Sequence, residues 1–305
     1  NALDANTTGS DNNALGRNAL GANTTGANNV AVGTQALDAN TTASNNTAIG
    51  HAALLANTIG SQNVAVGTNA LDANTDASLC VAVGYESLTA NTTGVFNTAV
   101  GGKALHSNTT AARNTAVGHV ALRDNTTGAN NTSVGDNSLS NNTTGDNNVA
   151  VGQNALNVNT NGGSNTAIGY GALDANTTGD QNTACGNNAL GANSTGQYNT
   201  AVGTQALINS TTASNNTALG AFALLTHTTG IRSTAVGYEA LYASNGSENT
   251  AVGYLSMHDL TSGSHNAALG DSSGANITSG TGNTCIGRRG GESLTTGDNN
   301  VVVGN

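Results

Sequence analysis

A glycine recurs every seventeen residues along almost the whole chain. In NTAVGHVALRDNTTGAN, residues 114–130, it is Gly118; its equivalents run from Gly16 to Gly304 in steps of 17, with one step of 16 between Gly237 and Gly253. A fixed short period indicates a repeat architecture in which neighbouring units bury each other's apolar faces. The 305 residues hold about eighteen units and begin and end within a unit, so we interpret them as a piece of a longer array.

The composition restricts the partners that the chain can have. Only 8% of the residues are charged and 3% aromatic, with no proline or tryptophan and a net charge of −10. Nucleic-acid binding requires clustered Lys and Arg, so no nucleic-acid partner is expected. No run of eighteen apolar residues occurs, so no membrane span is expected in this segment. Low charge and few large apolar groups also occur in disordered chains, but a strict period favours an ordered fold.

We number the repeat N-T-A-V-G-x-x-A-L-x-A-N-T-T-G-x-x from position 1 to position 17. Asn, Thr and Gly are poor helix formers, whereas short β-branched segments between Gly and Asn are typical of strands and turns. The repeat predicts an all-β fold, a parallel β-solenoid or β-roll of about 18 coils. Each coil would have a strand near NTAV, a second strand near ALxA, and corners where both glycines supply positive φ angles.

The TAV segment is apolar on both of its faces, because neighbouring strand residues point in opposite directions. We place the position 4 residue, such as Val117, inside the coil and the position 3 alanine outside. A strand with two apolar faces is normally covered on both, which predicts self-association through Ala99, Ala116 and Ala150. The alternative is that alanine is merely tolerated at an exposed site.

The segments NTAVGxxAL and NTAIGYGALDANTTGDQ, the latter at residues 165–181, resemble known repeats. They are similar to the YadA-like head repeats of trimeric autotransporter adhesins, and to repeats of phage and giant-virus tail-fibre-like and bacterial surface proteins. The resemblance implies a homotrimeric fibre, located outside the cell, on a cell surface or on a virion, that contacts a host or a surface. YadA-like heads use a shorter period, so the handedness and the trimer geometry stay open.

The corner after the position 5 glycine is the candidate site. Its turn residues include Gly84, Gly101, Gly118 and Gly135. The residues that follow vary, and the large aromatic ones are candidates for contact with a host-surface glycan or protein: Tyr85, Tyr170, Tyr238, Tyr254 and Phe222. Tyr combines an apolar ring with a hydroxyl, which suits such contacts. The alternative is that these are solvated corner residues without a function.

Asparagines at positions 1 and 12 would stack into amide ladders from coil to coil. Several of those at position 12 also start glycosylation sequons, as at Asn91, Asn108 and Asn125.

Cys80, Cys185 and Cys285 are too far apart in the repeat to pair within the chain. We interpret them as buried thiols, with Cys185 replacing a core valine, and keep an intermolecular disulfide as the alternative. No catalytic residues, cofactor or metal site are predicted.

The last repeats depart from the pattern. Position 9 becomes Met257, Gly274 and Gly291, while position 12 becomes Leu260, Ile277 and Leu294. We therefore divide the chain into a regular solenoid, residues 1–248, and variant coils of the same solenoid, residues 249–305.

These patterns favour a non-enzymatic extracellular fibre or adhesin module: a stiff shaft that presents surface-binding or host-binding sites. Two alternatives remain open. One is the subunit of a self-assembling extracellular filament. The other is an ice-binding β-solenoid, with stacked pairs such as Thr109–Thr110 and Thr126–Thr127 as the ice-binding array.

Overall fold

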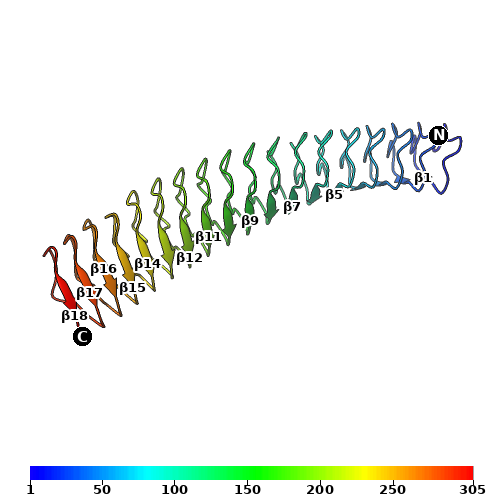
Figure 1. The fold of residues 1–305 in the computed structure, drawn as a ribbon. Coiled ribbons are helices and arrows are strands. Elements are labelled where there is room, and N and C mark those ends of the chain that lie inside the picture. Colours follow the sequence, from blue (N-terminus) through cyan, green and yellow to red (C-terminus); the bar gives the residue numbers. More distant parts are fainter. Residues whose placement is uncertain (305) are drawn as a thin grey trace. The chain divides into compact units, whose positions relative to one another are not determined.

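The chain folds as a parallel β-solenoid with one short strand per coil. A computed structural model describes residues 1–304, and within them every strand has three residues and no helix occurs. The chain divides into two compact units, Asn1–Gln153 and the residues from Asn154 onward. Figure 1 shows the repeated loops, and the arrows of the strands are distinct in the green to red coils. The predicted all-β parallel solenoid with a 17-residue repeat is therefore confirmed.

The first unit contains β1 to β9. They are Asn13–Leu15, Val30–Val32, Thr47–Ile49, Val64–Val66, Val81–Val83, Thr98–Val100, Thr115–Val117, Thr132–Val134 and Val149–Val151. Each strand pairs in parallel with the next, and equivalent repeat positions face each other, as in Ala99 opposite Ala116.

The second unit contains β10 to β18. They are Thr166–Ile168, Thr183–Cys185, Thr200–Val202, Thr217–Leu219, Thr234–Val236, Thr250–Val252, Ala267–Leu269, Thr284–Ile286 and Val301–Val303. The same in-register parallel pairing joins each strand to its successor, as in Thr200 opposite Thr217.

The predicted second strand near ALxA is wrong. In the coil of residues 114–130, Val120 and Leu122 have φ angles of 48° and 52°, and residues from His119 to Asp124 form turns. Left-handed residues interrupt a β ladder because they reverse the direction of the backbone. The turn still stacks, because the Val120 N–H donates to Gly102 O of the preceding coil and the Leu122 N–H to Ser138 O of the next, each at 3.0 Å.

The core of a coil is thin and is filled by small residues around one leucine. In residues 114–130 the side chains of Ala116, Ala121 and Leu122 are fully buried, together with Asn114 and Asn125. A coil of seventeen residues encloses little volume, so one leucine and several methyl groups fill it, and stacking closes both of its open ends.

The predicted asparagine ladders are confirmed, and they meet at one carbonyl. Asn29 and Asn40, at positions 1 and 12, donate from Nδ2 to the carbonyl oxygen of Ala43, at 2.9 and 3.1 Å. The Asn40 amide also donates to Asn23 Oδ1 at 2.8 Å, and Asn29 Oδ1 accepts the Asn46 backbone N–H at 3.0 Å. Both ladders therefore satisfy polar groups that are buried inside the coils.

The single sixteen-residue step removes one corner residue. A side-chain oxygen then takes the place of the backbone carbonyl that accepts hydrogen bonds in a regular corner. In a regular corner the Thr126 and Thr127 N–H groups both donate to Thr143 O, at 3.0 and 3.3 Å. In the shortened corner Asn245 Oδ1 accepts from the Thr228 and Thr229 N–H groups, both at 3.1 Å. Because the same acceptor position is filled, the stack continues past the deletion.

The variant coils bury an apolar side chain at position 12, alongside Met257 at position 9 in the first of them and opposite a glycine in the next. Leu260 and Ile277, at position 12, are fully buried where regular coils carry asparagine. A Cβ added to Gly274, at position 9, would lie 3.0 Å from Ile277 Cδ1, so the isoleucine occupies the space that the position 9 leucine fills elsewhere. The apolar side chain has moved across the coil, as the sequence predicts.

Candidate functional site

The outer face of the strands carries a regular apolar surface, which we call the strand face. It consists of the side chains at positions 2 and 4, on either side of the buried position 3. Position 4 is the more apolar column, and its side chains are half-buried or exposed, with 37% exposure at Val117, 42% at Ile168 and 53% at Leu269.

The predicted orientation of the TAV strand is therefore wrong. Ala99, Ala116 and Ala150 are completely buried inside their own coils and cannot face a partner, whereas Val117 points outward. The reason is volume: the position 9 leucine already occupies the thin interior, so only a methyl group fits at position 3. The residues that sequence reasoning missed are those at positions 2 and 4.

The strand face differs chemically from the other exposed columns of the solenoid. Position 4 holds Val, Ile, Leu or one Cys in every copy, and position 2 holds Thr or Val with one Asn and one Ala. Neither column contains a charge, whereas position 6 carries Arg, His, Asp and Tyr. Strand propensity favours β-branched residues at both columns, but it does not by itself exclude charge from an exposed surface.

The strand face is interrupted by a shallow groove in the second unit. Ala267 occupies position 2 in β16, and its short side chain leaves a space of about 210 Å³ between neighbouring coils. The lining is formed by Thr250, Val252, Ala267, Ala268, Leu269, Thr284 and Ile286.

The predicted turn glycines lie where the sequence analysis places them. Gly84, Gly101, Gly118 and Gly135 have φ angles of 138°, 133°, 140° and 137°. The second corner glycine, at position 15, does not use a positive φ, contrary to the prediction. A Cβ on Gly128 would lie 2.4 Å from Gly145 O, so crowding by the next coil favours glycine there. Ala43, Ala77 and Ala111 occupy the same position, so one methyl group is accommodated.

The predicted contact tyrosines are exposed at the corner that follows. The exposed fractions are 53% for Tyr85, 52% for Tyr170, 43% for Tyr238 and 52% for Tyr254, while Phe222 is half-buried. The structure brings Phe222, Tyr238 and Tyr254 together, because they lie in three consecutive coils. The Tyr238 and Tyr254 rings stack at 5.6 Å between centroids, and the Phe222 ring meets Tyr238 edge-on at 5.8 Å.

The three cysteines are unpaired within the described chain. Cys80 and Cys285 are buried, and burial raises the pKa of both thiols. Cys185 lies at position 4 of β11 and is half-buried, so it belongs to the strand face and not to the core, contrary to the expectation. The Cys80 thiol replaces a ladder asparagine and donates to Gly94 O at 3.3 Å.

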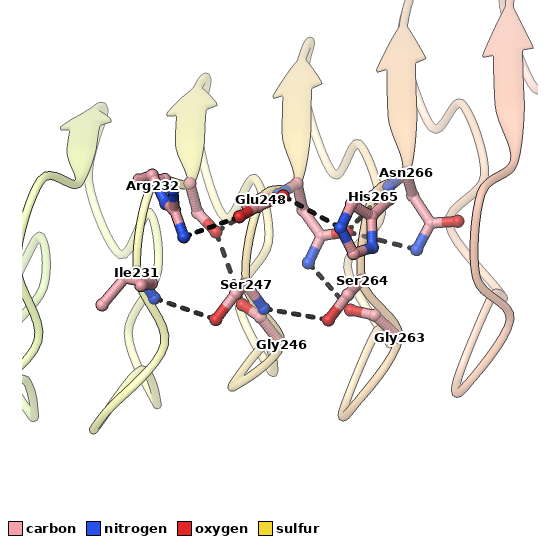
Figure 2. A network of polar contacts seen from close by, with 11 residues as sticks. Ile231, Arg232, Gly246, Ser247, Glu248, Gly263, Ser264, His265 and Asn266 are labelled. Atoms are coloured by element: carbon pink, nitrogen blue, oxygen red, sulfur yellow. Dashed lines mark hydrogen bonds and ion pairs between the residues drawn. The ribbon is translucent and has the colours of Figure 1, made fainter.

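Polar side chains brace the corner around the shortened coil (Figure 2). Glu248 lies between two basic side chains: Arg232 Nη2 is 2.8 Å from its Oε1, and His265 Nε2 is 2.9 Å from its Oε2. Beneath them the Ile231 N–H donates to Ser247 Oγ at 3.1 Å. Each exposed ion pair contributes little to stability. We interpret the network as holding the side chains of the shortened corner in place.

The sequon asparagines are closed to modification in the folded chain. Asn91, Asn108 and Asn125 are fully buried, and their amide nitrogens donate within the ladder. An attached glycan would have to pass through the neighbouring coils.

Among residues 1–304 no group of three or more His, Cys, Asp or Glu side chains has an arrangement that could hold a metal ion. That part of the chain also contains no helix with the length and hydropathy required to cross a membrane. Comparisons with protein-family models, curated proteins and solved structures gave no match to this chain.

Proposed function

We propose that the chain is a non-enzymatic structural fibre module that self-associates through its strand face. The observation that carries the proposal is the charge-free strand face, whose residue types hardly change from copy to copy. The exposed corner column at position 6 varies from copy to copy and carries charges, whereas the strand face does not, and this uniformity is consistent with a partner that contacts every coil. A second copy of the same chain is such a partner, because its face has the same spacing of about 4.8 Å per coil.

The proposed assembly is a homotrimer in which three strand faces surround a common axis. Burying the position 4 side chains would remove apolar area from water at about 25 cal/mol per Å². Each coil contributes a small area, and the sum over many coils gives a stable interface. The resemblance of the repeats to trimeric adhesin heads and tail-fibre proteins supports the trimer, and an extracellular, cell-surface or virion location. The backbone ladders would make the assembled shaft stiff.

Charges placed on the strand face test this proposal. We expect the triple variant Val100→Asp, Val117→Asp and Val134→Asp to weaken association by about a hundredfold or more, because the interface would bury unpaired carboxylates. The control is Thr110→Asp, Thr127→Asp and Thr144→Asp, which adds the same charges in the same order of coils at an exposed corner. Sedimentation equilibrium measures both. A monomeric unmodified chain, or a charged strand-face variant that stays fully assembled, would contradict the proposal.

The two alternatives give different results in simple assays. A filament subunit would form end-to-end polymers in electron micrographs instead of discrete oligomers.

The structure argues against the predicted Thr array as an ice-binding surface, because the Thr126 hydroxyl already donates to Thr143 O at 3.0 Å. The strand face, with Thr at most position 2 sites, is the more regular surface. Thermal hysteresis that disappears in the strand-face variant would favour ice binding.

A further inference from the structure

The same three side chains form a cluster in each unit. In the first unit they are Tyr85, Glu86 and His106, with His106 Nε2 3.6 Å from Glu86 Oε2. In the second unit they are Tyr238, Glu239 and His258, with His258 Nε2 3.4 Å from Glu239 Oε2. Tyr and Glu occupy positions 6 and 7, and His occupies position 10 of the next coil. The chain has four Glu and six His, and its only two Tyr-Glu pairs both have this neighbour.

The glutamate is held in place in both clusters. A hydrogen bond to the adjacent Glu side chain raises the pKa of Tyr85 and of Tyr238 above its ordinary value of about 10. In the first cluster Lys103 Nζ also lies 3.6 Å from Glu86 Oε2. A carboxylate has about four lone-pair sites, so both glutamates keep acceptor capacity beyond these contacts. Each cluster therefore presents an exposed ring beside an oriented hydrogen-bond acceptor.

In the second unit more rings extend the cluster. Phe222, Tyr238 and Tyr254 follow one another in consecutive coils, as described above. Tyr242 stacks on His258, with 5.0 Å between the ring centroids. Half of the chain's eight aromatic side chains therefore lie in three neighbouring coils. Packing does not require them, because other coils carry Thr, Gly or Asn at the same positions and keep the same fold.

Exposed rings next to a fixed carboxylate suit a ligand with apolar C–H faces and many hydroxyl groups. Glu239 follows Tyr238 in the chain. Asp259 Oδ1 lies 2.7 Å from His258 Nδ1, whose ring stacks on Tyr242. These two carboxylates would repel an anionic ligand. The ring centroids of Phe222, Tyr238 and Tyr254 follow one another at 5.8 and 5.6 Å. One sugar of an extended hexose polymer spans a similar length. A neutral polysaccharide meets all three conditions.

We propose that Phe222, Tyr238, Glu239 and Tyr254 form a binding strip for a neutral hexose polymer, and that Tyr85, Glu86 and His106 form a smaller copy. This inference rests on the proposed function, since it names what the shaft binds along its length. Single contacts would be weak, and several copies of the strip on one fibre would raise the avidity.

The test titrates the whole chain with cellohexaose, laminarihexaose, maltohexaose and mannohexaose. Isothermal titration calorimetry measures binding in every variant, including those that lack the tyrosines of the strip. We expect at least one hexaose to bind, and the double variant Tyr238→Ala and Tyr254→Ala to lower its affinity by about tenfold or more. Glu239→Gln should also lower it by about tenfold.

The matched control is Tyr170→Ala. Tyr170 is as exposed as Tyr254 and occupies the same repeat position, but it is followed by Gly171 in place of a glutamate. We expect this variant to bind normally. The inference is overturned if no hexaose binds, if the double variant binds as well as the unmodified chain, or if Tyr170→Ala loses as much. Sedimentation of the same samples separates this result from the assembly proposal, because a monomer also contains the strip.

Discussion

At the scale of single residues, two repeat positions have a positive φ, but one carries leucine and the other always carries glycine. Leu122 has a φ of 52°, close to the left-handed helical minimum that an L-residue reaches at a cost of about 1–2 kcal/mol. It is retained because its side chain fills the core. Gly118 has a φ of 140°, outside that minimum, and its neighbour in the next coil leaves no room for a Cβ. Every copy therefore has glycine at position 5.

Replacing Gly118 by Val should lower the free energy of unfolding by on the order of 1–3 kcal/mol from the backbone angle alone. A further loss is expected because the added Cβ would lie 2.4 Å from Gly135 O. Urea unfolding, with amide exchange over residues 101–135, measures the effect. The control is Gly128→Ala, where an added Cβ would approach Gly145 O equally closely but the φ angle is not positive. Ala111 already occupies the same repeat position, so this variant should cost much less. Equal losses in the two variants would show that position 5 has no special requirement.

At the scale of the repeated element, the position 12 asparagine ladder is continuous over most coils and leaves buried polar atoms unpaired where it ends. Each asparagine accepts from the next, as Asn108 Oδ1 does from Asn125 at 2.9 Å. Among the described residues, Asn193 Oδ1 and the hydroxyls of Ser210 and Ser244 are buried without a partner. The ladder thus ends after Asn193, where serine and then His227 replace asparagine, before the apolar residues of the variant coils begin.

His227 should make this element sensitive to acid. Burial lowers the pKa of His227 below its ordinary value of 6.5, and the carbonyl oxygens of Ser244 and Gly230, 2.9 and 2.8 Å from the ring nitrogens, only partly oppose this. The unfolded state then binds the proton more readily. Stability is therefore full above about pH 6.5 and falls as the pH drops below that value, by at most about 1.4 kcal/mol per pH unit.

The comparison with His227→Asn isolates this contribution, because the other five histidines are present in both proteins. We expect the difference in unfolding free energy between the two proteins to change between pH 7.5 and pH 5, with the unmodified chain losing more. A gain in its stability on acidification would mean that the two carbonyl groups stabilise the imidazolium, contrary to the prediction.

At the scale of the whole molecule, successive coils pair in the same register, so equivalent residues align in columns along the stack. One outward position becomes an apolar column, and one inward position becomes a ladder, because equivalent residues pair in parallel. A symmetric assembly about an axis along the stack would therefore bring equivalent residues of different copies to the same level.

Cys185 provides a natural reporter of that assembly, since it replaces valine on the strand face. Mild oxidation should join two chains through Cys185, while the buried Cys80 and Cys285 stay reduced. In a trimer the third thiol has no partner, so at most about two-thirds of the chains would run as disulfide-linked dimers. Cys185→Val should abolish the product. Complete conversion to dimer would indicate a two-fold assembly, and no cross-linking would argue against a parallel seam.

The sequence alone determined the period, the all-β class, the position 5 turn and the two asparagine ladders. Each of these depends on local backbone preference or on the alignment of equivalent residues, and a strict repeat shows both directly. Only the tertiary structure decided which side of the TAV strand faces outward, since both sides are apolar and the choice depends on how much volume one coil encloses. Ala116 is inside because Leu122 already occupies that space. The Tyr238, Glu239 and His258 cluster also required the structure, because its members meet only when neighbouring coils stack.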